Sequence, residues 1–255
     1  MSRIKGTEVL AEELYGCHIT TLHIQSRQAA TSLNKPVGSY ITIDFGESLN
    51  VYTKKMDIGE CLAAVLQRIM KPYYHKKLCI CGIGNRGLPI GALGPEVTYN
   101  LPTKLFARKN LDGNFCEVFT FETGTEWSTN IRIAKAIGAD CILLVDSLIT
   151  KNPSQLFHTI QVSMSDKTDF SLSGRVGDWS VLGIPVIALG MPVAISSPIF
   201  SSERDIDSEL ITGNEMQAVI ASAGQIIAYA ILRICWPLQS QTECVVLSGL
   251  NRNFR

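Results

Sequence analysis

The sequence predicts an α/β protein in which helices cover both faces of a mostly parallel β-sheet, a three-layer α/β/α sandwich. Short runs rich in β-branched and aromatic residues alternate along the chain with longer segments of helical periodicity, and this order is typical of parallel sheets with crossover helices. Two of the short runs, LCIC (78–81) and ILLV (142–145), are apolar throughout. Strands covered on both faces have this composition.

Seven strands and four helices follow from these patterns. The expected strands are 18–24, 39–45, 77–83, 116–122, 141–147, 157–163 and 184–190. The expected helices are 57–71, 92–101, 125–137 and 214–235. The first two strands, a hairpin-like pair, and 157–163 are expected to be antiparallel. The last helix is long and apolar, but Gln225 and Arg233 interrupt it, so we expect a buried core helix and no membrane segment.

Length and composition indicate one domain over residues 1–255, with the strands of residues 1–50 packed on it and a surface loop at 196–213. The chain has 46% hydrophobic and 18% charged residues and a formal net charge of zero, which argues against nucleic acid as a partner. Its N-terminal residues do not form a secretory signal. We therefore expect the eight cysteines to be reduced, in a cytoplasm, as small buried hydrophobes with no metal site. No cofactor is expected.

The glycine-rich stretch GIGNRGLPIGALGP (82–95) connects a predicted strand to a predicted helix. Glycine tolerates positive φ and lets a backbone approach a ligand closely. In open α/β sheets the site lies beyond the carboxyl ends of the strands, which selects this turn and the segments 122–126, 146–148 and 190–192. The residues expected to contact substrate there are Gly84, Asn85, Gly91, Gly124 and Gly190.

Two carboxylates at these strand ends are the candidate catalytic residues. Asp146 ends the run ILLV, where partial desolvation can tune its proton affinity, and Glu126 stands near the start of the helix 125–137. The pair could share one proton and activate a water, as in an acid protease. The plainer readings are that Asp146 caps a turn and that Glu126 complements a helix dipole. A dinucleotide site on the glycines of GIGNRG is disfavoured by Pro89.

Several blocks in the same order identify a family. They are KPVGSYITIDF (35–45), GIGN (82–85), ALGP (92–95), TGTE (123–126), ADCILLVDSL (139–148), TIQVS (159–163), LGIPVIALGMP (182–192) and the helix 214–235. With these blocks the chain resembles the germination proteases of spore-forming bacteria, which degrade small acid-soluble spore proteins. The resemblance implies a phosphorylase/hydrolase-like sandwich related to the hydrogenase-maturation proteases, a homo-oligomer, and a location in the spore core or forespore.

The resemblance also implies an acid protease with two aspartates. Asp146 matches one of them. The other stands immediately before ALGP, where this chain has Gly91. Further departures are the short segment 196–213 in place of a long insertion, Ser196 where an Asp is usual, and a rewritten segment 164–180.

Two hypotheses follow. The chain is a compact endopeptidase that uses Asp146 with Glu126, or with a water polarised by the backbone N–H groups of the turn. Alternatively, it is a catalytically impaired paralogue that binds spore proteins or a protease partner, because Gly91 replaces the second aspartate. A third and weaker hypothesis, that the chain binds a small molecule or a nucleotide, is supported by the glycine turn alone.

Overall fold

A single eight-stranded sheet organises the part of the chain that the computed structural model describes, residues 4–46, 52–102, 113–123, 127–165, 183–195, 213–237 and 239–250. The strand order is β1-β2-β3-β7-β8-β6-β4-β5. The strands are β1 (Thr7–Leu14), β2 (Cys17–Ile24), β3 (Gly38–Asp44), β4 (Lys77–Ile83), β5 (Glu117–Thr123), β6 (Cys141–Thr150), β7 (Thr159–Ser165) and β8 (Val186–Ile195).

The predicted α/β class is confirmed. The sheet was expected to be mostly parallel and is mixed, with three parallel and four antiparallel strand pairs. Strands β5, β4, β6 and β8 pair in parallel, whereas β8, β7, β3, β2 and β1 pair in antiparallel. The antiparallel part begins with a tight hairpin between β1 and β2, whose two connecting residues, Tyr15 and Gly16, have φ of 51° and 69°. Positive φ at both positions suits the two-residue turn that matches the twist of a hairpin.

All four predicted helices are present, with shifted ends. The helices are α1 (Arg27–Leu33), α2 (Tyr52–Met70), α3 (Leu93–Tyr99), α5 (Trp127–Ile137), α6 (Gly213–Cys235) and α7 (Gln241–Ser248), with short 3-10 turns η1 (Lys71–Tyr73), η2 (Pro89–Gly91) and η3 (Pro153–Gln155). The sequence reading missed β1, α1 and α7. Helix α7 carries a detectable signal, because Ser240 and Glu243 form a capping box at its start.

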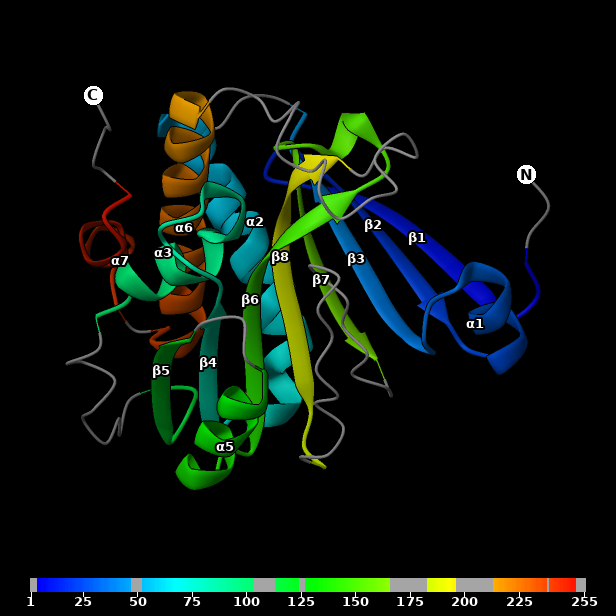
Figure 1. The fold of residues 1–255 in the computed structure, drawn as a ribbon, viewed down its shortest axis with the longest axis horizontal. Helices are drawn as coiled ribbons and strands as arrows, with labels where there is room; N and C mark the ends of the chain where they lie inside the picture. The colour runs from blue at the N-terminus through cyan, green and yellow to red at the C-terminus, as the bar shows by residue number, and fades with distance from the viewer. Residues whose placement is uncertain are drawn as a thin grey trace.

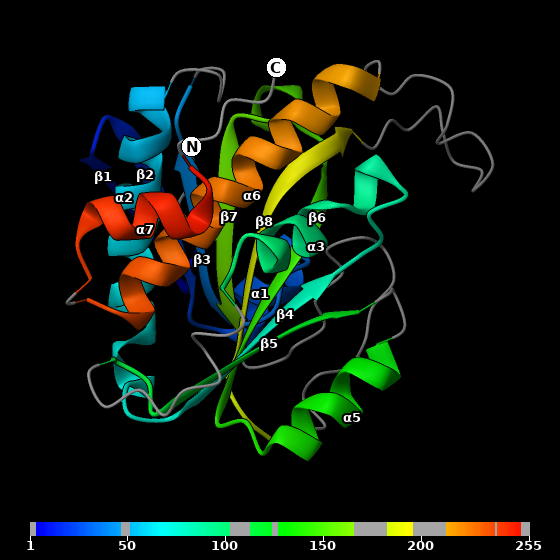
Figure 2. The same cartoon turned by 90° about the vertical axis from the view of Figure 1, so that its left-hand side faces the viewer.

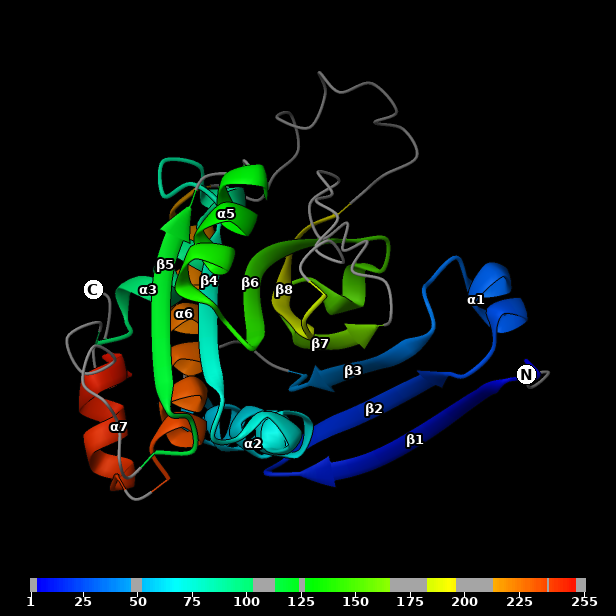
Figure 3. The ribbon, with the colours of Figure 1, turned by 90° about the horizontal axis from the view of Figure 1, so that it is seen from below.

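The helices lie in two layers, one on each side of the sheet (Figures 1 and 3). Helices α2, α3, α6 and α7 cover one face and α5 covers the other, while α1 lies at the far end of the β1–β3 strands. Leu143 and Val145 of β6 pack into the core under the first group of helices. Their neighbours Ile142 and Leu144 pack into a second core with Ile131 of α5. The central strands are apolar throughout because both of their faces are covered.

Helix α6 is the centre of the larger core. It lies obliquely across the sheet (Figure 2), and a run of its residues from Ile226 to Leu232 is fully buried. In length and composition the segment Met216–Cys235 would suffice to span a membrane, but 78% of that window is buried inside the protein. The prediction of a buried core helix is confirmed.

Candidate functional site

The glycine-rich turn after β4 is a tight loop closed on itself. The N–H of Asn85 donates to the carbonyl oxygen of Gly91 (2.9 Å), and the N–H of Gly91 donates to Leu88 (2.8 Å). Gly84 has φ of 138°, and a Cβ built there would lie 1.8 Å from the Gly91 oxygen. Only glycine fits at position 84, because the backbone of the same turn fills the place of its side chain.

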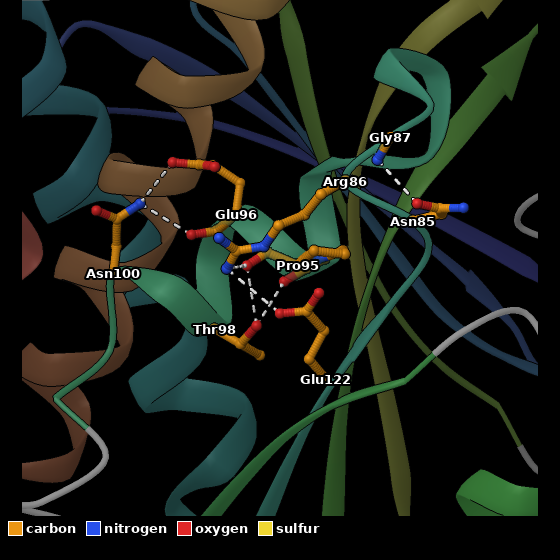
Figure 4. Close-up of polar contacts among 9 residues, drawn as sticks. Asn85, Arg86, Gly87, Pro95, Glu96, Thr98, Asn100 and Glu122 are labelled. Carbon is orange, nitrogen blue, oxygen red and sulfur yellow. Dashed lines mark hydrogen bonds and ion pairs between the residues drawn. The ribbon is translucent and has the colours of Figure 1, made fainter.

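The side chain of Asn85 is used inside the turn. Its Oδ1 accepts a hydrogen bond from the N–H of Gly87 (2.8 Å; Figure 4), the short-range pattern by which Asn stabilises turns. The sequence predicted Asn85 as a substrate contact. The geometry supplies a structural reason for asparagine at this position, and the amide nitrogen of the side chain stays available for another partner.

Arg86 fastens the turn to its surroundings. One of its Nη atoms donates to the carbonyl oxygen of Pro95 (2.9 Å) and lies 3.3 Å from a carboxylate oxygen of Glu122 (Figure 4). The guanidinium also stacks over the ring of Tyr99, 4.6 Å from its centre. Arg86 therefore links the turn to α3 and to the end of β5. Sequence reasoning missed this link, because it joins segments that only the strand order brings together.

Asp146 is buried, with 5% of its surface exposed. The sequence placed it at the end of a strand, and this placement is wrong, because β6 continues to Thr150. The reason is that β8 is equally long and pairs with β6 past this point, whereas the pairing of β4 with β6 stops at Val145. Asp146 thus stands where β4 leaves the sheet and its turn begins. Its Oδ1 accepts a hydrogen bond from the N–H of Ser147 (2.7 Å).

Helix α3 brings the glycine turn against this part of β6. A Cβ built on Gly94 would lie 2.4 Å from the carbonyl oxygen of Ile83 and 2.5 Å from that of Val145. The helix can approach both strands this closely only because position 94 lacks a side chain. The first turn of α3 consequently packs on the backbone immediately before Asp146, which brings the turn and the strand position of the carboxylate close together.

Gly190 lies beside Asp146 on the neighbouring strand β8. A Cβ at this position would lie 2.3 Å from the carbonyl oxygen of Asp146 and 2.9 Å from the side chain of Leu148. The sequence predicted Gly190 as a substrate contact, and that role stays a prediction. The glycine has a packing reason of its own, since Leu148 fills the space next to it.

Position 91 is open to a side chain. The nearest atom to a Cβ built on Gly91 is the backbone nitrogen of Asn85 at 3.7 Å, an ordinary van der Waals contact. An aspartate at position 91 therefore fits the turn without a clash at its Cβ. Gly124 and Glu126, the two other predicted site residues, lie outside the described residues, and the proposed pairing of Glu126 with Asp146 stays a prediction.

A pocket of about 340 Å³ opens on the sheet face that bears the Asp146 side chain. Asp146 pairs with Gly190, which pairs in turn with Gln161 of β7, so the three share one row across the sheet. By alternation along the strands, Asp146 and Gln161 point away from the larger core. Residues lining the pocket include Lys35, Tyr40, Thr42, Leu148, Gln161 and Ser163, and none of its described lining residues is acidic.

Lys35 is the cation at the edge of this pocket. Its Nζ lies 4.7 Å from the ring centre of Tyr40, and burial lowers the pKa of its ammonium group. Tyr40 is itself held by a hydrogen bond from its hydroxyl to the carbonyl oxygen of Pro36 (2.8 Å). Among its described lining residues, the pocket thus combines hydroxyl and amide groups with the Lys35 ammonium. Within the described ranges no group of three or more His, Cys, Asp or Glu side chains could hold a metal ion.

The fold and this site define an α/β protein in which a glycine-rich strand-to-helix turn packs beside a buried carboxylate. The chain belongs to the germination protease family, whose model matches residues 1–218. The resemblance stated from the sequence blocks is confirmed by this match.

Three curated relatives illustrate the similarity. The chain is 28% identical over 215 residues to the germination protease of Caldanaerobacter subterraneus subsp. tengcongensis, covering 76% of this chain and 64% of the relative. It is 26% identical to a germination protease of Clostridium perfringens, covering 72% and 62%. It is also 26% identical to the germination protease of Priestia megaterium, covering 79% and 59%. The alignments thus span about three-fifths of these relatives' length.

A solved structure of the [NiFe] hydrogenase maturation protease HycI from Thermococcus kodakarensis is similar to part of the chain. The TM-score is 0.37 and the sequence identity 13%, over 64% of this chain and 98% of that one. A similarity of this size carries no inference about the activity of this protein.

Proposed function

We propose that this protein is an endopeptidase of the germination protease type, with Asp146 as its catalytic carboxylate. The observation that carries the proposal is the position of Asp146, buried in the strand β6 at the point where β4 departs and its glycine turn packs alongside. A carboxylate held in such a place can take a proton from an attacking water and return it to the leaving amine. Membership of the family makes peptide hydrolysis the reaction to test.

The site as described holds one of the two aspartates that the family resemblance implies. Two carboxylates a few ångströms apart share a proton, and this arrangement is what lets an aspartic protease pair acid and base roles. With Gly91 in the place of the second aspartate, the remaining candidates for the second role are Glu126 and a water polarised by N–H groups of the turn. General acid–base catalysis contributes about 10² to 10⁴ in rate, so we expect a slow enzyme.

We further propose that the substrate is a small acid-soluble spore protein, bound as an extended chain along the sheet face that carries Asp146 and the pocket. Neighbouring strands are about 4.8 Å apart and an extended chain advances about 3.3 Å per residue. The row from Asp146 to Gln161 crosses two strand spacings, so a peptide with its scissile bond at Asp146 would place a side chain about three residues away over the pocket. The location proposed is the cytoplasm of the spore core or forespore, and the proposed assembly is a homo-oligomer.

The second candidate function is that of an impaired paralogue that binds spore proteins or a protease partner. Gly91 favours it, since a position with room for a Cβ does not carry the aspartate that the family resemblance implies. Binding would then use the same sheet face without cleavage.

One experiment separates the two functions. A purified small acid-soluble spore protein is incubated with four forms of the full chain: unchanged, Asp146→Asn, Gly91→Asp, and Glu13→Gln as a control that removes an exposed carboxylate of β1. The proposal expects cleavage by the unchanged chain and by Glu13→Gln, loss of at least about 10²-fold with Asp146→Asn, and faster cleavage with Gly91→Asp.

Cleavage by Gly91→Asp alone would overturn the endopeptidase proposal and favour the binding function. Cleavage that survives Asp146→Asn would remove Asp146 from the mechanism. Circular dichroism of each variant confirms that the fold is kept, which the free space at position 91 leads us to expect for Gly91→Asp.

A further inference from the structure

Strand β1 forms one edge of the sheet, and its outer side is open. The strand order places β1 at the end of the sheet, and Figure 3 shows no described helix or strand beyond it. The strand pairs with β2 in continuous register from Thr7 to Leu14. The described part of the chain therefore presents a long, regular edge that has no neighbouring strand.

The backbone groups on this outer side belong to alternate residues. Leu14 and Cys17 flank the two-residue turn of the hairpin. In such a hairpin the flanking pair exchanges backbone hydrogen bonds, and every second residue along the strand follows it. The N–H and C=O groups of the residues between, Val9, Ala11 and Glu13, consequently point away from β2.

Exposed apolar side chains gather along the same edge. Among the described residues nine large hydrophobic side chains are exposed, and four of them lie between residues 4 and 15: Ile4 (37%), Val9 (59%), Leu10 (51%) and Tyr15 (49%). Edge strands are usually protected by lysine, proline or a bulge. Strand β1 contains neither lysine nor proline and pairs with β2 without a bulge, so its edge is suited to pairing with another strand.

We propose that β1 pairs in antiparallel with β1 of a second copy of this chain, so that the two sheets become one continuous sheet about a two-fold axis at Val9. The inference rests on the homo-oligomer proposed above, to which it gives a specific contact, and it does not depend on peptidase activity. A two-fold axis brings the same surface of each copy together and is the commonest symmetry of homo-oligomers.

The glutamates of β1 select the register. With the axis at Val9, each Val9 faces its counterpart and Glu8 faces Leu10. Pairing of the outward groups permits shifts of two residues. One such shift places Glu8 opposite Glu12, and the shift in the other direction places Glu8 opposite its own counterpart. Like charges directly opposite each other destabilise a strand pair, so both shifted registers are unfavourable.

The same register brings opposite charges together at both ends of the paired strands. Lys5, in the turn before β1, comes beside Glu13 of the second copy, and the symmetry makes this contact twice. The exposed Tyr15 comes near the exposed Ile4 of the second copy, so apolar surface is covered as well. A register centred on Ala11 also keeps the glutamates apart, but it separates Lys5 from Glu13.

The interface lies apart from the proposed catalytic carboxylate. Strand β6 is the sixth strand from this edge, so changes in β1 do not reach Asp146. Because the two-fold axis of an antiparallel strand pair is perpendicular to the sheet, the pockets of both copies open on the same face of the continuous sheet.

Analytical ultracentrifugation of the full chain, over about a hundredfold range of protein concentration, tests the interface. Val9→Lys places like charges together at the axis, and Ala11→Pro removes an outward N–H that β2 does not use. Each should raise the dissociation constant of the dimer by at least about tenfold. Ala11→Ser, which keeps the N–H, and Gln28→Lys, on the exposed side of α1, are the matched controls and should leave it unchanged.

Disulfide cross-linking tests the register. In a Cys116→Ser background, which removes the exposed cysteine, Val9→Cys should form a linked dimer on oxidation. The Cα atoms of a hydrogen-bonded pair lie about 5.5 Å apart, within the range of a disulfide. The two cysteines of Ala11→Cys would be four residues apart, about 13 Å along the strands, and should link far less. A stronger link from Ala11→Cys would overturn the register.

The other outcomes separate the interface from the assembly. Monomers of the unchanged chain at every concentration would overturn both the interface and the homo-oligomer. An assembly that persists in Val9→Lys and Ala11→Pro would overturn this interface alone. Neither measurement requires cleavage of a substrate, so the result stands apart from the proposed peptidase activity.

Discussion

The N–H of Asn85 donates to the carbonyl oxygen of Gly91 over 2.9 Å, and this bond holds that oxygen in the space where a side chain at position 84 would stand. The loop that follows β4 is consequently closed by a backbone hydrogen bond at its base. Position 91 in the same loop still has room for a Cβ, whose nearest neighbour would be the Asn85 nitrogen at 3.7 Å. A catalytic turn needs both properties, because a fixed backbone positions whatever group the open position carries.

Gly84→Ala is expected to lower the free energy of unfolding by about 2–4 kcal/mol, because it adds a positive-φ penalty to a backbone clash. The control is Gly138→Ala, where φ is 66° and a Cβ meets no atom within 4 Å, so only the conformational cost of about 1–2 kcal/mol applies. Urea denaturation measures both. Equal decreases in the free energy of unfolding would contradict this, because they would show that the turn rearranges to accommodate the Cβ at position 84.

The packing of Arg86 is expected to contribute more to the free energy of unfolding than its ion pair does. Both partners of its ion pair are about two-fifths exposed (42% and 41%), so Glu122→Gln should cost less than about 1 kcal/mol and nothing measurable in high salt. Arg86→Ala also removes the bond to Pro95 and the stack on Tyr99, and should cost about 1–2 kcal/mol at any salt. Urea melts at low and high ionic strength test this. A larger loss from Glu122→Gln would contradict it.

Filling the pocket is expected to weaken substrate binding and to leave the chemistry intact. Ser163 lies on β7 opposite Ala188 and Tyr40, and Ser163→Leu extends into the pocket. On the proposed function, KM for a spore-protein peptide should rise about tenfold with kcat little changed, the pattern of lost uniform binding. Ser32→Leu, on the exposed side of α1, is the matched control. A fall in kcat at constant KM would place the pocket outside the substrate path.

Stability is expected to fall in alkali because of buried thiols, among them Cys79 and Cys141. Burial raises the pKa of Cys79 and of Cys141 to about 12, well above the value of about 8.5 in an unfolded chain. Between these values the folded state keeps protons that the unfolded state loses, so the free energy of unfolding decreases as pH rises from about 9 to 12.

Urea denaturation between pH 8 and pH 11 measures how the free energy of unfolding changes with pH. Cys79→Ala should make this dependence weaker, because it removes one titrating thiol. The alanine variant is also less stable at every pH because of its cavity, so the slope and not the absolute value is compared. An unchanged slope would show that Cys79 does not contribute.

Local patterns predicted most of the secondary structure. Strand β4 was predicted with its observed bounds, and helix α6 within one residue. Strand β1 was missed because TEVLAEEL is an edge strand that is largely exposed on both faces, so it shows none of the alternation that identifies a half-buried strand.

The features of the candidate site also fall into those encoded locally and those that depend on the tertiary structure. The sequence by itself determined the α/β class, the glycine turn, the family blocks, the candidate Asp146 and the absence of an aspartate at position 91, because each is encoded in neighbouring residues. Only the tertiary structure decided that Asp146 lies inside β6, that Gly190 packs on its carbonyl, and that Arg86 reaches Glu122. These contacts depend on strand order and register, which are set by packing between distant segments and leave no periodic signal in the chain.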